Sequence, residues 1–445
     1  MKGTWKRIIS TVLVAGMVFT MAACGSSNTD SVQNTDSISS TAASASKVSN
    51  EKITLSLWAI FTENDPGSIA FFDAFNKVKA KHSNITFNYD AVLNEAYKTK
   101  IKTAAAANEM PDIFYTWGGG FAKPFIDAGK AVPIDQYVQD GTLDKLIPGS
   151  THYYTYDNKL YGLPLDNWLC SLYVNKELFE TNGIKVPTTF DELLTASKEF
   201  NAKGITPFAL GAKDRWSPQF YQIALAIRTM GIDHIQNALD KKESFDQEGF
   251  TESAKLFKDL IDSKAFPDGT TGLSNDEVQA EFAAGKYPMM FSGNWMGYIL
   301  DDKKNPIYGK TEILPFPQVT GGKGDSDGFI GGCITTFMIS STNKYQAESA
   351  EVLKTMGAEF SKSYYEMGLG LPSWNVDFDM TKISPATKRI HELTQSAKGL
   401  TLAWDTVLNA QPTQVYLDLV QGLIVGTITP EQFTKQLQAA QDADK

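Results

Sequence analysis

The sequence has few of the residues from which metal and disulfide sites are built. Its 445 residues include three cysteines and four histidines, the histidines lie far apart, and no CxxC pair occurs. A zinc-type site needs such ligands at close spacing, so we expect no metal and no cofactor. Cys170 and Cys333 each lie in an apolar, strand-like run, where two buried free thiols are favoured over a disulfide.

No cluster of basic residues occurs after Arg7. The formal net charge is 41 − 51 = −10, and removal of residues 1–23, which carry three basic and no acidic residues, makes it 38 − 51 = −13. An acidic chain is repelled by nucleic acids and by anionic lipid surfaces. We therefore expect no nucleic-acid partner.

The apolar run at residues 8–23 is shorter than the roughly 20 residues that a membrane span needs. Basic residues before it and small residues at its end, just before Cys24, predict a signal peptide over residues 1–23. Residues 21–25, MAACG, resemble a lipobox, so we predict that Cys24 is lipidated and that this lipid is the only membrane contact, on the outer face of the cytoplasmic membrane. An ordinary cleaved signal and an uncleaved anchor are the alternatives. Residues 24–50 are mostly small and polar, which predicts a flexible tether.

Short runs with alternating apolar residues are separated by segments with helical spacing, which predicts an α/β fold with helices on both faces of open sheets. In such sheets ligands bind beyond the carboxyl ends of the strands. The chain after residue 50 is too long for one hydrophobic core, so we expect two domains. Strands are expected over residues 53–57, 85–89, 111–115, 169–174, 205–210, 287–292 and 330–339.

Polar residues mark the starts of several helices. Capping boxes are predicted at Thr189, Ser274 and Thr429, each followed three positions later by Glu or Gln. Asp65 precedes a proline and is expected to be an N-cap.

Several ordered motifs resemble one family, the extracellular solute-binding proteins of sugar ABC importers, which includes maltose-, multiple-sugar- and raffinose-binding proteins. The motifs are PDIFYTWGG at 111–119, YGLPLD at 161–166, LYVNK at 172–176, PTTFDEL at 187–193, FAAGKYPMMFSGNW at 282–295 and GTITPE at 426–431.

The resemblance implies a two-lobed, periplasmic-binding-protein-like fold with discontinuous lobes. The first lobe would hold residues 51–163 and 326–372, the second 164–315 and 376–445, with hinge segments at 316–325 and 373–375. It also implies a non-enzymatic monomer that closes on an oligosaccharide between the lobes and delivers it to the permease subunits of an importer.

The aromatic residues support a sugar ligand. A pyranose has an apolar face and a rim of hydroxyl groups, so its site needs flat aromatic rings beside carboxylates or amides. Most tryptophans after residue 50 stand next to such groups or to glycine. Glycines 118–120 are expected to let the backbone approach a ligand closely. The predicted ligand-binding residues are Glu63, Asn64, Trp117, Asp166, Trp168, Asp214, Trp216, Asn294, Trp295, Trp374 and Asp405.

Two other functions stay open at this point. Paired carboxylates also occur in secreted glycoside hydrolases, although nothing in the sequence sets two of them at a defined separation. The same fold also binds peptides, polyamines or iron chelates. Each tryptophan has the further alternative of a purely structural place in a core.

Overall fold

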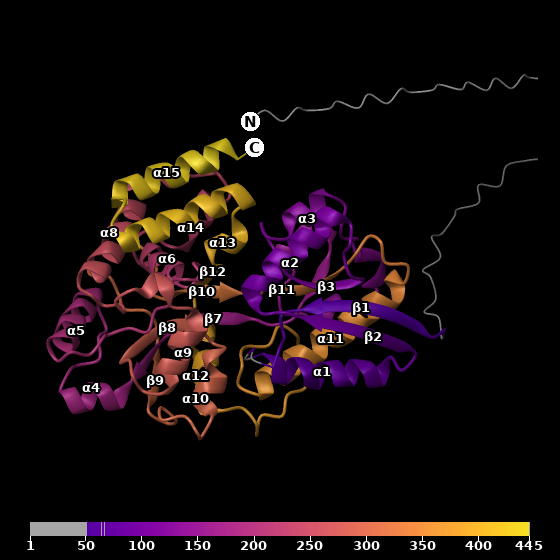
Figure 1. The fold of residues 1–445 in the computed structure, drawn as a ribbon, viewed down its shortest axis with the longest axis horizontal. Coiled ribbons are helices and arrows are strands. Elements are labelled where there is room, and N and C mark those ends of the chain that lie inside the picture. Colours follow the sequence, from indigo (N-terminus) through magenta and orange to yellow (C-terminus); the bar gives the residue numbers. More distant parts are fainter. Residues whose placement is uncertain (1–50, 64, 66, 445) are drawn as a thin grey trace, which may run out of the picture. The chain divides into compact units, whose positions relative to one another are not determined.

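The computed structural model describes residues 51–63, 65 and 67–444, which lie within one compact unit (Figure 1). The predicted signal peptide, tether and lipidation at Cys24, and the candidate ligand residue Asn64, lie outside the described residues.

The first sheet has five strands in the order β2-β1-β3-β11-β6. β1 pairs in parallel with β2 and β3, while β11 runs antiparallel to both β3 and β6. Its inward side chains, such as Leu55 and Leu57, are almost fully buried. The bounds are β1 Ile53–Ala59, β2 Ile85–Ala91, β3 Ile113–Trp117, β6 Gly162–Pro164 and β11 Thr335–Ile339.

Helices cover both faces of this sheet, with α2 and α3 on one side and α1 and α11 on the other (Figure 1). A separate hairpin joins β4 to β5. The bounds are α1 Ser68–Lys81, α2 Asn94–Ala107, α3 Lys123–Asp127, α11 Gln346–Glu366, β4 Thr155–Tyr156 and β5 Lys159–Leu160.

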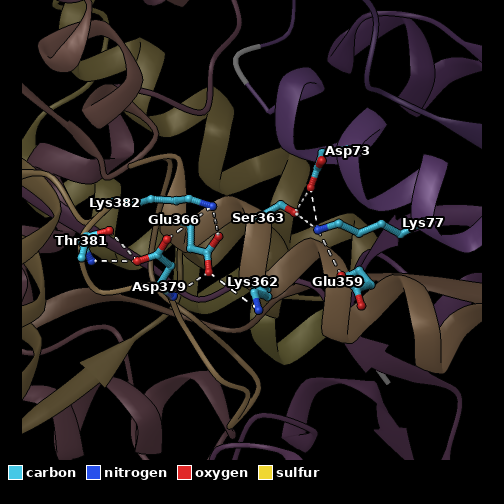
Figure 2. Close-up of polar contacts among 9 residues, drawn as sticks. All are labelled: Asp73, Lys77, Glu359, Lys362, Ser363, Glu366, Asp379, Thr381 and Lys382. Carbon is cyan, nitrogen blue, oxygen red and sulfur yellow. Dashed lines mark hydrogen bonds and ion pairs between the residues drawn. The ribbon is translucent and has the colours of Figure 1, made fainter.

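Polar contacts link α1 to α11 and then to the loop at 379–382 (Figure 2). Lys77 of α1 lies 2.8 Å from Asp73 and 3.2 Å from Glu359 of α11. Farther along α11, Glu366 accepts the backbone N–H of Asp379 at 2.8 Å. The ion pairs are partly exposed, so each adds about 1 kcal/mol or less to stability, and the apolar contact between the helices contributes more.

The second sheet has the order β12-β10-β7-β8, with β9 also paired to β7. β7 is buried along its whole length and is antiparallel to β8, β9 and β10. The strand bounds are β7 Trp168–Asn175, β8 Met289–Gly293, β9 Thr311–Leu314, β10 Gly328–Gly332 and β12 Gly399–Thr401. The helices around it are α4 Lys176–Asn182, α5 Phe190–Ala202, α6 Gln219–Thr229, α7 Ile232–Leu239, α8 Glu248–Asp262, α9 Asn275–Ala283, α10 Met296–Asp301, α12 Pro385–Ser396, α13 Trp404–Val407, α14 Ala410–Val425 and α15 Pro430–Ala443.

The local helix signals of the sequence are confirmed. All three predicted capping boxes form, at Thr189, Ser274 and Thr429, and in each the N-cap side chain accepts a backbone N–H three residues later. The predicted cap at Asp65 is wrong, because α1 begins at Ser68 with Gly67 at its N-cap. The Asp65 carboxylate instead accepts the N–H of Gly67 at 2.7 Å.

Two strand predictions differ from the structure. Residues 205–210 contribute one isolated bridge, Phe208 to Met289, and no strand. The single strand expected over 330–339 is two strands in different sheets, because the chain passes from β10 to β11 at Cys333 and Ile334.

The strand pairing also corrects the predicted lobe boundaries. Residues 316–325 connect β9 to β10, and both strands belong to the second sheet, so this segment is no crossing between the lobes. β10 belongs to the second sheet although residues 326–372 were assigned to the first lobe. β10 packs closely against β7 of the second sheet, since a Cβ at Gly331 would lie 2.3 Å from the carbonyl oxygen of Trp168 on β7.

The chain passes between the two sheets at three places that are hydrogen-bonded to one another. Leu165, between β6 and β7, donates its N–H to Thr335 at the start of β11, at 3.1 Å. Asn167 and Leu371 exchange backbone hydrogen bonds of 3.1 and 3.0 Å. The third crossing is anchored by Trp374, whose Nε1 donates to the carbonyl oxygen of Pro164 at 2.7 Å. The predicted fold class, α/β with two lobes, is confirmed.

Within residues 51–63, 65 and 67–444, no helix combines the length and the apolar character needed to cross a bilayer.

Candidate ligand-binding site

Three of the predicted tryptophans gather beside the second sheet. The ring centroid of Trp295 lies 5.9 Å from that of Trp168 and 6.1 Å from that of Trp216. Phe220 of α6 completes the group, 5.8 Å from Trp168 and 5.5 Å from Trp216. We call these four residues the aromatic platform. Trp168 is 6% exposed, whereas Trp216 and Trp295 are half-buried, so two indole rings retain open surface for a ligand with an apolar face.

A glycine makes this arrangement possible. Gly293 ends β8, and a Cβ built on it would lie 2.0 Å from the ring of Trp295. The indole therefore folds back over the strand end in the space that any side chain would fill. A substitution at Gly293 is expected to push Trp295 out of the platform.

Buried polar atoms without hydrogen-bond partners among the described residues surround the platform. They include three acceptors and two donors. Leaving such an atom unpaired costs about 1–3 kcal/mol, which is recovered when a ligand or water supplies the partner. Both kinds of atom are required by hydroxyl groups, which donate and accept. The acceptors are Asn167 Oδ1, Asn294 Oδ1 and Asp405 Oδ1, and the donors are Trp168 Nε1 and Gln219 Nε2.

Asp166 lies where the chain passes from the first sheet to the second. The residue is 9% exposed, and its carboxylate accepts a hydrogen bond from the hydroxyl group of Thr335. Burial raises the pKa of Asp166 to about 6, partly offset by that hydrogen bond. Asp166 is therefore a strong acceptor at neutral pH, two residues from the platform ring of Trp168.

Residues from distant parts of the chain meet around Asp405 of α13. Its backbone N–H donates to Gln219 Oε1 at 3.2 Å, which connects it to the first turn of α6. Burial raises the pKa of Asp405, and the nearby Lys98 ammonium of α2 lowers it. Lys98 in turn lies 5.3 Å from the ring centroid of Trp117 and 2.7 Å from Glu95. Trp117 is half-buried at the end of β3, so this group joins the first sheet to the platform side.

Other predicted site residues have structural roles or lie elsewhere. Trp374 is 2% exposed in the core of the first sheet, and this burial argues against a ligand contact by its ring. Asp214 accepts the N–H of Asn275 at 2.8 Å and so binds the first turn of α9. Glu63 is exposed.

The glycine loop after Trp117, which we expected to approach a ligand, lies against protein backbone. The N–H of Gly120 donates to the carbonyl oxygen of Thr406 at 2.8 Å, and a Cβ on Gly120 would lie 1.9 Å from the carbonyl oxygen of Leu408. The glycines therefore allow this loop to pack against the residues that follow Asp405.

Sequence reasoning missed four contributors: Asn167, Lys98, Gln219 and Phe220. Asn167 stands between two candidates, and that position was a usable signal. Gln219 and Phe220 look like ordinary residues in the first turn of a helix. Lys98 lies in an Ala-rich helix and meets Asp405 only through the fold.

The fold and this aromatic, polar site define a ligand-binding protein with two α/β lobes. Residues 58–359 match the family model described as bacterial extracellular solute-binding protein. The chain belongs to this family, which confirms the resemblance noted in the sequence.

Several known proteins are similar to the chain. The multiple sugar-binding protein of Streptococcus mutans is 25% identical over 334 residues, which is 73% of this chain and 76% of that protein. A solved structure from work on xylan utilization by Caldanaerobius polysaccharolyticus is 41% identical, has a TM-score of 0.82, and is matched over 87% of this chain and 99% of that chain. A chitin oligosaccharide binding protein is 27% identical, with a TM-score of 0.78 and coverages of 88% and 98%. The matched relatives are binding proteins.

Proposed function

We propose that the protein binds an oligosaccharide on the aromatic platform and delivers it to the permease subunits of an ABC importer. The single observation that carries this proposal is the combination of half-buried, clustered tryptophans with unpaired buried acceptors and donors. A sugar ring supplies an apolar face for Trp216 and Trp295 and hydroxyl groups for the polar atoms.

The similar structures narrow the sugar. The 41% identical protein comes from work on xylan utilization, and a more distant one binds chitin oligosaccharides, so the β-linked xylo-oligosaccharides are the first candidates. The test is calorimetric titration with xylo-, chito-, malto- and α-galacto-oligosaccharides. We expect a dissociation constant near or below micromolar, about −8 kcal/mol, for a xylo-oligosaccharide. No heat with any of the four classes would contradict sugar binding.

Contacts from both lobes are the proposed cause of closure. A ligand shifts the equilibrium between open and closed forms only by binding one of them more tightly. Trp117 at the end of β3 in the first sheet, and the platform with Asp405 beside the second sheet, offer such contacts. X-ray scattering should show a smaller radius of gyration at saturation with the sugar, and an unchanged radius would refute closure.

Attachment and chemistry are separate parts of the proposal. Lipidation of Cys24 would hold the protein at the outer face of the membrane, and palmitate labelling that persists in Cys24→Ser would refute it. We also propose that the protein is a monomer and that it does not cleave its ligand. Thin-layer chromatography after prolonged incubation should recover the oligosaccharide intact.

A further inference from the structure

Five buried polar atoms around the platform lack a hydrogen-bond partner among the described residues, and three of them are acceptors: Asn167 Oδ1, Asn294 Oδ1 and Asp405 Oδ1. The other two are donors, Trp168 Nε1 and Gln219 Nε2, and the Gln219 side chain also helps to lower the pKa of Asp405. Asn294 is fully buried and Asn167 is 8% exposed, so within the described part of the chain bulk water has little access to them. A hydroxyl group supplies a donor, whereas a ligand carboxylate supplies only acceptors.

The charges near Asp405 also favour an uncharged ligand over one with a carboxylate. The Lys98 ammonium is paired with the Glu95 carboxylate at 2.7 Å, and both charges act on Asp405: Lys98 lowers the pKa of its carboxyl and Glu95 raises it. One cation therefore faces two anions at the Trp117 end of the site. Lys98 also lies over the ring of Trp117, where a cation is stabilised by the aromatic face.

The geometry points to Asp405 as a specificity-determining residue that restricts the site to uncharged sugars and rejects oligosaccharides carrying a uronic acid. A uronate beside Asp405 would place like charges together in a partly desolvated site and would leave Oδ1 unpaired. This inference rests on the proposed function, because it names which oligosaccharides the same site takes.

Three ligands distinguish the effect of the ligand's charge on binding from the effect of its shape. They are xylotetraose, xylotetraose with one glucuronic acid branch, and the same branched sugar after reduction of its carboxyl group to the alcohol. Calorimetry should show that the wild-type protein binds the reduced branched sugar at least tenfold more tightly than the acidic one. Asp405→Asn should narrow that ratio at least fivefold, and Lys98→Gln should widen it. Asp262→Asn removes the same charge from the exposed surface of α8 and should leave the ratio unchanged.

The opposite signs expected for Asp405→Asn and Lys98→Gln keep the inference testable if one variant fails to fold. Equal binding of the acidic and reduced sugars by the wild-type protein overturns it, as does an unchanged ratio in Asp405→Asn. If xylotetraose binds and both branched sugars fail, shape selects the ligand and the inference is wrong. If the acidic sugar binds and xylotetraose does not, sugar binding stands and the inference fails. If no sugar binds, the proposed function itself fails.

Discussion

Gly120→Ala tests how closely the loop after β3 packs against the residues that follow Asp405. A Cβ at this position would lie 1.9 Å from the carbonyl oxygen of Leu408 and 2.8 Å from that of Val407. Both neighbours are backbone atoms, which cannot rotate away as a flexible side chain does. One of the two segments must therefore move by about 1 Å, and the hydrogen bond from Gly120 to Thr406 is strained or lost. Overpacking of this kind costs about 1–3 kcal/mol, and we expect the upper end.

The size of the effect on the melting temperature follows from the length of the folded chain. The entropy of unfolding of globular proteins is about 2.1 cal/mol/K per residue, which for about 390 residues gives about 0.8 kcal/mol/K. A loss of about 3 kcal/mol should therefore lower the Tm by about 4 °C in differential scanning calorimetry. The matched control is Gly272→Ala, where nothing lies within 4 Å of the added Cβ and φ is not positive. If both variants melt at the same temperature, the packing argument is wrong.

Three further outcomes are expected. Trp295→Ala removes one ring of the platform and should weaken oligosaccharide binding in calorimetry by roughly 30–100-fold, about 2–3 kcal/mol. The control is Trp58→Ala, which should bind as the wild type does, because Trp58 lies on β1 with its ring against Lys100 of α2. Burial raises the pKa of Asp166 to about 6, above its value in the unfolded chain, so the folded state keeps the proton longer and the free energy of unfolding falls as pH rises from about 4 to about 6. Between pH 4 and pH 7, urea titrations should show the free energy of unfolding falling by about 2 kcal/mol more in the wild type than in Asp166→Asn, and parallel pH profiles of the two proteins would contradict this. The thiols of Cys170 and Cys333 are buried, which raises the pKa of each, so Ellman's reagent should react with them only after unfolding by urea, and rapid reaction of the native protein would contradict their burial.

Local signals explain which parts of the fold could be predicted. The capping boxes at Thr189, Ser274 and Thr429 depend on residues within one turn, so the sequence contains the whole cause. Strand assignments depend on distant partners. Phe208, Ala209 and Leu210 are buried, which gives residues 205–210 an apolar pattern like that of a strand, yet Phe208 pairs with Met289 at a single bridge. The strand-like run at 330–339 is divided near Cys333 because β10 pairs in the second sheet and β11 in the first, and those partners lie far away in the sequence.

The candidate site divides in the same way. Trp168, Trp216 and Trp295 were predicted because their sequence neighbours are polar, and in the structure the ring of Trp295 lies 5.9 Å from that of Trp168 and 6.1 Å from that of Trp216. Trp374 has a polar neighbour too, but its Nε1 is used by Pro164. Lys98 could not be predicted, because its approach to Asp405 joins residues that are about 300 positions apart.

The position of the unpaired atoms suggests how ligand binding could cause the lobes to move. Asn167 exchanges two backbone hydrogen bonds with Leu371, and these join two of the three crossings between the sheets. Its side-chain oxygen is unpaired within the described residues and adjoins Trp168. A hydroxyl group bound there would contact the crossing itself, so its binding energy would act on the segment whose backbone angles must change when the lobes move. Asp166, held by Thr335 at the neighbouring crossing, extends the same coupling to β11. Ligand contact and lobe movement would therefore share residues, with no intervening chain of contacts needed between them.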